Sequence, residues 1–189
     1  MGLLDILTGR RKLAQPAEDR LFAISTAYVT FETSLGITTR GGAAIVFQSL
    51  ATADFTSIVK DMEEVVRATA SDSATSVETS VDSFGFSWLI VKGQDFDSLV
   101  VSINAVSTAL EGGGYGDRLL CAVFAFQDES RRPLYWIYNY KRGFFSPFVP
   151  IGPQQRDNER ELVLKAQAGN ELPIEPELSR WFPLWGIPV

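Results

Sequence analysis

Residues 119–148 constrain the fold more than any other stretch. Two runs of β-favouring residues, 119–126 and 134–140, flank the polar segment 127–133, and a shorter run, 144–148, follows the basic turn Lys141-Arg-Gly143. Runs of this length and composition, separated by short turns, predict a three-stranded antiparallel meander. The chain is therefore expected to fold around an antiparallel sheet, and further strands are indicated at 43–48, 77–82 and 84–91, with a turn at 38–42.

Three stretches carry apolar side chains at steps of three and four residues, which is typical of amphipathic helices. The first begins at Glu18, the second follows Thr52 or Asp54, and the third follows Asp95. Thr52, Asp54 and Asp95 can cap these helices by accepting hydrogen bonds from free backbone amides. The glycines at 112–114 end the third helix, because glycine adopts the positive φ found at helix ends.

A fourth helix is expected from Asp157 or Asn158 to Gly169, with Leu162 and Ala166 facing inward. These elements indicate an α+β fold: a single two-layer domain with an antiparallel sheet of about five strands and helices packed on it. The domain is expected to span 18–189. It includes a C-terminal helical segment and apolar tail, 155–189, and is preceded by an appendage, 1–17.

The composition of the chain disfavours some classes of partner. A net charge of −6 over 189 residues argues against nucleic-acid binding, which requires a dense basic surface. A single cysteine indicates a reducing compartment, and no apolar run approaches the roughly 20 residues of a spanning helix. A cytoplasmic protein is expected. The appendage carries an apolar patch at 3–7 before basic residues at 10–12. This leaves open a weak peripheral membrane contact, a partner-binding clip or a segment folded onto its own domain.

The sequence offers little for catalysis. With no histidine, a Ser-His-Asp or Cys-His arrangement and a histidine-ligated metal site are excluded. Cys121 lies in an apolar strand, where a thiol is usually inert. The glycines at 112–116 leave a helix rather than enter one, so they do not resemble a phosphate-binding loop. Carboxylate pairs, including Asp128-Glu129 and Glu159/Glu161, are expected in solvent or at helix caps. We therefore expect no enzyme, no cofactor and no metal.

Two stretches are candidates for partner binding. The first is the hairpin turn, where basic residues are flanked by aromatic ones; the alternative is an ordinary basic turn with its aromatic side chains in the core. The second is the apolar tail, which must either dock on the domain, form a dimer contact or bind a partner, because exposure would promote aggregation. The candidate residues are Tyr140, Lys141, Arg142, Phe144 and Phe145 in the turn, and Arg180, Trp181, Phe182 and Trp185 in the tail. A further hypothesis is a small-ligand-binding or enzymatic domain with a pocket lined by Trp88, Tyr115, Tyr135 and Tyr138.

Several strings along the chain resemble the PspAB family, the small PspA-associated proteins found beside a phage-shock-protein-A homologue. The strings are Met1-Gly-Leu-Leu-Asp5, Phe84-Gly-Phe-Ser-Trp-Leu89, Leu119-Leu-Cys121, Tyr140-Lys-Arg-Gly143, Pro147-Phe148, Arg156-Asp-Asn158 with Glu161-Leu162, and Arg180-Trp-Phe-Pro-Leu-Trp-Gly186.

The resemblance implies a non-enzymatic accessory of an envelope-stress response that acts through a PspA-type coiled-coil protein. The order of helices and strands is also similar to YbjN-like proteins and type III secretion chaperones, which bind protein segments and often form homodimers. That second likeness concerns topology, which does not determine function.

Overall fold

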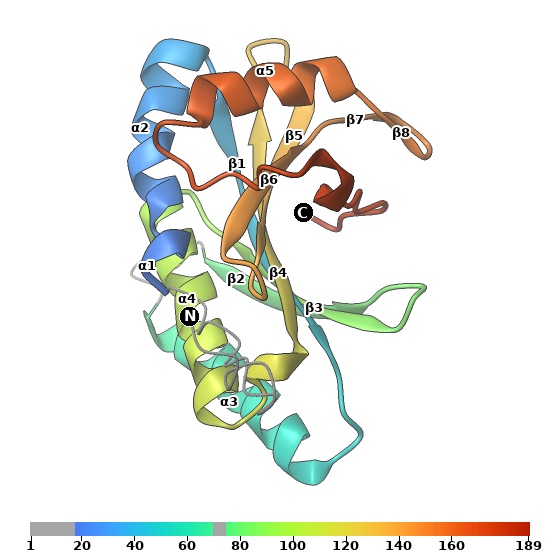
Figure 1. Cartoon of the computed structure of the whole chain (residues 1–189). Helices are drawn as coiled ribbons and strands as arrows, with labels where there is room; N and C mark the ends of the chain where they lie inside the picture. The colour runs from blue at the N-terminus through green and yellow to red at the C-terminus, as the bar shows by residue number, and fades with distance from the viewer. Residues whose placement is uncertain (1–17, 70–74) are drawn as a thin grey trace, which may run out of the picture.

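The computed structural model describes residues 18–69 and 75–189, and its centre is a six-stranded antiparallel sheet (Figure 1). The strand order is β2-β3-β1-β4-β5-β6, so the longest strand, β1, lies inside the sheet. A separate two-stranded sheet pairs β7 with β8. The strands are β1 Thr38–Gln48, β2 Ser76–Val81, β3 Phe86–Lys92, β4 Leu119–Gln127, β5 Pro133–Asn139, β6 Phe144–Phe148, β7 Pro150–Gly152 and β8 Gln155–Arg156.

The main helices are α2 Ala23–Leu35, α3 Ala53–Thr69, α4 Phe96–Gly112 and α5 Asn158–Ala168, with a single turn, α1 Glu18–Leu21, before α2. The caps at Thr52, Asp95 and Asp157 are confirmed: their side chains accept hydrogen bonds from the backbone N–H of Phe55, Ser98 and Arg160. Short 3-10 turns lie at Gly116–Arg118 and Leu178–Arg180.

Successive side chains along a strand point to opposite sides of the sheet. Both faces of this sheet carry a cluster of buried side chains. In β4, Phe124 and Phe126 pack into the larger cluster under α2, α3 and α4, whereas Cys121, Val123 and Ala125 belong to a second cluster on the opposite face. In Figure 1, α2, α3 and α4 lie on one side of the sheet, α5 runs across its upper end, and the dark red C-terminal segment lies on the other side. The predicted α+β class, with helices packed on an antiparallel sheet, is confirmed.

The C-terminal tail covers the second face. Leu184, Trp185, Ile187 and Val189 pack against the second cluster. The Trp185 and Phe148 rings meet edge to face, with centroids 5.2 Å apart. Docking on the chain's own domain, one of the outcomes the sequence leaves open for the tail, is the arrangement observed.

One strand prediction needs correction. The range 38–42 is not a turn but the first half of β1. The main sheet has six strands, close to the expected number of about five. The Thr-Thr-Arg-Gly-Gly sequence at 38–42 is typical of a turn, and Gly41 does adopt a positive φ of 72°. The glycine instead sits at a register shift against β4, where a β-bulge lets the strand continue.

The inward face of α5 also differs from the prediction. Leu162 is 46% exposed and Ala166 is exposed, whereas Glu161, Leu164 and Ala168 are buried. A buried glutamate is tolerated because Arg156 binds its carboxylate through both Nε and Nη2, and the Val149 backbone N–H donates to the same group at 2.9 Å. Glu161 is therefore not the solvated carboxylate that the sequence suggests.

The expected appendage at 1–17 lies outside the described residues. No helix among the ranges 18–69 and 75–189 has the length and apolar character to cross a membrane.

Candidate functional site

The two candidate stretches, far apart in the sequence, meet at one groove beside the β5–β6 hairpin. We call it the hairpin–tail groove, and its volume is about 180 Å³. Lys141, Arg142 and Phe144 reach it from the hairpin, and Arg180 and Phe182 reach it from the tail. The structure thus places five of the nine candidate residues around a single depression, together with Leu120, Cys121, Ile137, Asn139, Ser146, Glu175 and Leu184.

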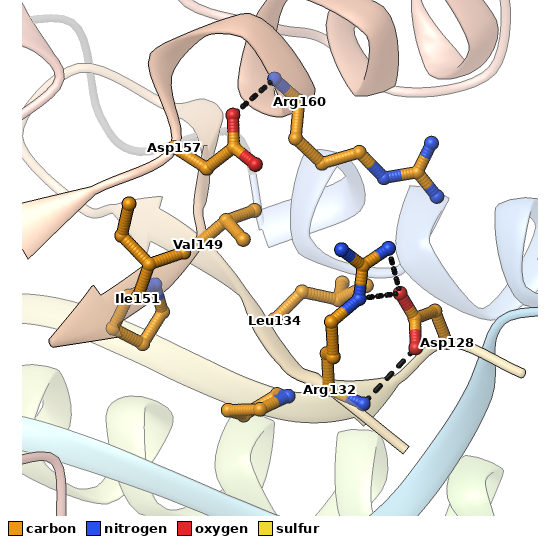
Figure 2. Close-up of a pocket in the computed structure, with 9 residues that line it drawn as sticks. Asp128, Arg132, Leu134, Val149, Ile151, Asp157 and Arg160 are labelled. Atoms are coloured by element: carbon orange, nitrogen blue, oxygen red, sulfur yellow. Dashed lines mark hydrogen bonds and ion pairs between the residues drawn. The ribbon is translucent and has the colours of Figure 1, made fainter. Parts of the chain in front are cut away.

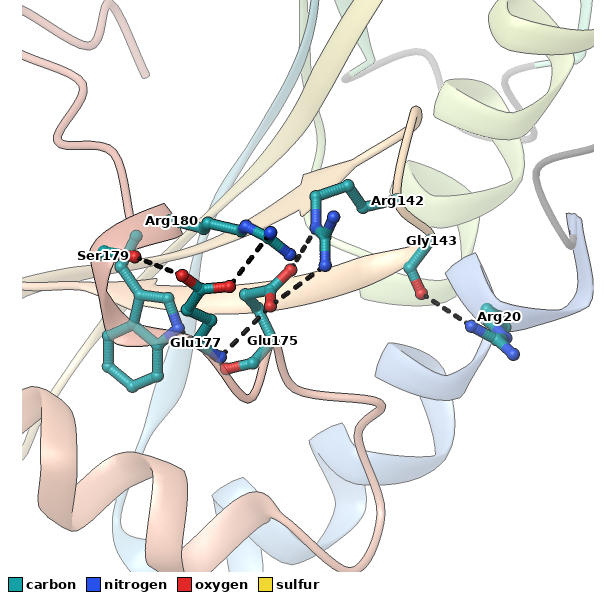
Figure 3. Close-up of polar contacts among 8 residues, drawn as sticks. Arg20, Arg142, Gly143, Glu175, Glu177, Ser179 and Arg180 are labelled. Atoms are coloured by element: carbon teal, nitrogen blue, oxygen red, sulfur yellow. Dashed lines mark hydrogen bonds and ion pairs between the residues drawn. The ribbon is translucent and has the colours of Figure 1, made fainter. Parts of the chain in front are cut away.

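Glu175 ties the two sides of the groove together (Figure 3). Its carboxylate pairs with the Arg142 guanidinium and also accepts a hydrogen bond from the Glu177 backbone N–H at 3.1 Å. Burial opposes ionisation of Glu175, but the hydrogen bonds from Arg142 and Glu177 outweigh it and hold the pKa of this carboxyl below its usual value. The charge is therefore retained at neutral pH, and Arg142 is held in place at the rim.

The 171–175 segment also adds to the edge of the sheet. The Phe145 N–H donates to the Pro173 carbonyl at 2.8 Å, and the Glu175 N–H donates to the Phe145 carbonyl at 2.8 Å. These bonds cover part of the β6 edge, which would otherwise present unpaired backbone groups. Because these bonds fix the backbone of Glu175 beside β6, its side chain can reach Arg142.

Phe144 is half-buried under two arginines. The Arg20 guanidinium carbon lies 5.4 Å from its ring centroid and that of Arg142 lies 6.0 Å away. A cation–aromatic patch, one of the two arrangements that the sequence leaves open at this turn, is therefore present at Phe144, with Arg20 of α1 as a member that sequence reasoning missed. Arg20 is distant in the sequence and no local pattern marks it.

The remaining candidates lie in or near the interior. Tyr140 is 4% exposed, Phe145 is fully buried and Trp181 is 6% exposed, and none of the three lines the groove. Trp181 donates from its indole Nε1 to the Glu175 carbonyl at 3.0 Å. Trp185 is half-buried against the second face of the sheet.

A second depression lies at the other end of β5 from the groove, and we call it the α5 pocket (Figure 2). Its volume is about 290 Å³. Leu134, Val149, Pro150 and Ile151 are among its apolar walls; its charged residues are Asp128, Arg132, Asp157 and Arg160. No pattern in the sequence marks this pocket, because its walls come from three separate elements.

Among models of protein families, the one described as PspA associated protein B matches residues 1–189, the whole chain. The chain belongs to the PspAB family. The description of the PspAB family names an association with PspA, which agrees with an accessory role. Neither the curated proteins nor the solved structures contain a match, so the expected likeness to YbjN-like proteins is not confirmed.

Little chemistry is available to this PspAB-family chain at the groove. Burial raises the pKa of the Cys121 thiol to about 12, so the thiolate is scarce at neutral pH. Among the residues that the structure describes, no three His, Cys, Asp or Glu side chains group as metal ligands. What the groove does offer is an apolar floor with a cationic rim.

The aromatic pocket expected from Trp88, Tyr115, Tyr135 and Tyr138 does not form. Trp88 and Tyr135 lie on the tail side of the sheet, whereas Tyr138 and Tyr115 pack with the cluster on the helix side. The separation follows from strand geometry, because Tyr135 and Tyr138 are an odd number of residues apart and point to opposite faces.

Proposed function

We propose that this chain is a non-catalytic accessory that binds a PspA-type coiled-coil protein through the hairpin–tail groove, as part of an envelope-stress response. The observation that carries the proposal is the meeting of the two candidate stretches at this groove. The family membership supports the choice of partner. The absence of histidine and the burial of Cys121 support a role without catalysis.

The groove suits a segment that is apolar with acidic flanks. Leu120, Ile137 and Leu184 form apolar walls, and Phe182, 64% exposed, extends this surface outward. Of the three cations that line the groove, Arg142 pairs with Glu175 and Arg180 pairs with Glu177 at 3.0 Å. Lys141 has no ion-pair partner in the part of the chain that the structure describes.

A coiled coil can supply both features. Its helices carry apolar residues at the a and d positions and often glutamate at the neighbouring e and g positions. The groove has room for one or two apolar side chains rather than a whole helix, since its volume is below the roughly 300–1,000 Å³ of a drug-sized ligand pocket. Arginine and aromatic residues of this kind are frequent among the side chains that dominate binding energy.

The test measures binding of the purified PspA-type partner to the full chain by calorimetry. Phe182→Ala is expected to weaken the affinity about tenfold or more, because an aromatic hot spot is lost. Phe84→Ala is the matched control, since Phe84 is also an exposed phenylalanine (76% exposed) but lies in the β2–β3 turn.

A second pair tests the charge. Lys141→Glu is expected to weaken binding and to reduce its dependence on salt, whereas Lys60→Glu on the exposed side of α3 leaves both unchanged. Equal losses for Phe182→Ala and Phe84→Ala, or no loss for either, would show that the groove is not the binding surface. Absence of binding by the unaltered chain would remove the partner itself.

A further inference from the structure

The α5 pocket holds an arginine whose side chain is not engaged. Within the ranges 18–69 and 75–189, the Arg160 side chain makes no hydrogen bond or ion pair, and its Nε is buried without an acceptor. Its backbone N–H donates to the Asp157 carboxylate at 2.9 Å. Figure 2 shows the Arg160 side chain extending from the first turn of α5 toward Arg132 and Asp128.

Two of the neighbouring charges, Asp128 and Arg132, are already paired with each other. Asp128 accepts from the backbone N–H of Ser130 at 2.9 Å and of Arg132 at 3.0 Å, and its other oxygen binds the Arg132 guanidinium through Nε and Nη2, both at 2.8 Å. Four donors thus saturate Asp128, and Arg132 is neutralised by it. Of the two lining arginines, Arg160 is the one whose guanidinium has no ion-pair partner among the residues that the structure describes.

The walls around that cation are apolar. Leu134 and Val149 are buried, Pro133 and Pro150 are half-buried, and Ile151 is 62% exposed at the mouth. The charged lining is balanced, because Asp128 pairs with Arg132 and the Asp157 carboxylate caps α5, which leaves the Arg160 guanidinium as the cation without a partner in the described part of the chain. Apolar walls with a few placed polar groups are the usual form of a site for a small amphipathic molecule. Its volume of about 290 Å³ corresponds to roughly ten water molecules, which suits a ligand of similar heavy-atom count.

We propose that the α5 pocket binds a small aliphatic monocarboxylate, whose carboxylate pairs with Arg160 while its hydrocarbon chain lies against Leu134, Val149 and Ile151. The planar guanidinium can donate two parallel hydrogen bonds to a carboxylate. Binding would satisfy donors that the free protein leaves unpaired, which a buried polar group requires. This site is separate from the hairpin–tail groove and does not depend on the proposed partner.

The probe is hexanoate, titrated into the full ¹⁵N-labelled chain with NMR detection of backbone and arginine Nε–H signals. Saturable shifts are expected for Arg160 Nε–H and for amides around Leu134 and Val149. Hexanamide, which keeps the shape and loses the charge, is expected to bind at least tenfold more weakly. Acetate, which keeps the charge and loses the chain, is also expected to bind more weakly.

Three variants and one control variant complete the test. Arg160→Gln is expected to abolish the response to hexanoate, and Arg160→Lys to retain part of it, because lysine keeps the charge without the fork. Ile151→Ser, at an exposed wall position, is expected to weaken hexanoate more than acetate. Arg67→Gln, on the exposed side of α3, is the control and should bind like the unaltered chain.

The proposal is overturned by equal binding of hexanamide, by an unchanged response of folded Arg160→Gln, or by shifts that gather at Arg142 instead. It also fails if hexanoate produces no saturable shifts while Arg160→Gln weakens capture of the PspA-type protein. That result would assign the pocket to a protein side chain. Thermal unfolding of each variant separates loss of binding from loss of the fold. If the Arg160 variants do not fold, Ile151→Ser still tests the pocket through its expected effect on hexanoate binding.

Discussion

Glu161 shows how a single residue can organise the end of this chain. Its carboxylate, 2% exposed, binds Arg156 and accepts from the Val149 N–H. Arg156 in turn donates from Nη1 to the Trp181 carbonyl at 2.7 Å and lies 5.5 Å from the Phe148 ring centroid. The strand β6, the helix α5 and the start of the tail are therefore joined through one buried ion pair.

Replacing that glutamate by its neutral isostere should be costly. Glu161→Gln leaves the Arg156 guanidinium, 17% exposed, without its counter-ion, and breaking a buried pair in this way costs about 3 kcal/mol or more. Glu159→Gln on the same helix removes an exposed carboxylate and should cost less than about 1 kcal/mol. Urea unfolding of both variants measures the difference, and equal free energies of unfolding would contradict the role given to Glu161.

Adjacent residues in the tail element are expected to separate stability from binding. Trp181 is 6% exposed and its ring lies 5.7 Å from the Lys165 Nζ, whereas its neighbour Phe182 is 64% exposed. Trp181→Ala should lower the free energy of unfolding by about 3–5 kcal/mol, as large buried aromatic truncations do. Phe182→Ala should change it by less than about 0.5 kcal/mol while weakening partner binding. Urea unfolding measures the first effect and calorimetry the second; comparable destabilisation by both would show that the tail is not docked as observed.

The elements also show what a sequence can and cannot reveal. Amphipathic spacing and capping side chains predict α3 and α4 correctly, because both signals are local. The inward face of α5 is predicted incorrectly, because burial of Glu161 depends on Arg156 and Val149 being brought beside it by the tertiary fold. The bulge at Gly41 in β1 is missed for the same reason: its partners lie on β4.

The candidate site was predictable only in part. Aromatic and basic composition marks both the hairpin turn and the tail, but nothing local indicates that Arg142 and Arg180 line the same groove. Glu175, which positions Arg142, lies between prolines in a stretch with no motif. The α5 pocket, formed by walls from β5, β7 and α5 and their connecting segments, carries no sequence signal at all.

At the scale of the whole molecule, the buried sheet should make the fold sensitive to alkaline pH. Burial raises the pKa of Cys121 from 9.0 to about 12 and that of Tyr138 from 10.0 to about 12, and it also raises the pKa of Tyr140. In the unfolded chain these groups lose their protons near their ordinary pKa values, while the folded chain keeps them. The unfolded state then binds fewer protons, so stability falls as the pH rises.

The free energy of unfolding should therefore be insensitive to these groups at neutral pH. It should decline from about pH 9 upward, by up to roughly 1.4 kcal/mol per pH unit for each titrating group. Urea unfolding at neutral pH and at about pH 10.5 measures the decline. Cys121→Ala removes the group with the lowest ordinary pKa, so its decline should begin later and be shallower than that of the unaltered chain. A stability that is the same at both pH values, or a Cys121→Ala profile parallel to that of the unaltered chain, would mean that Cys121 is not held protonated by the folded sheet.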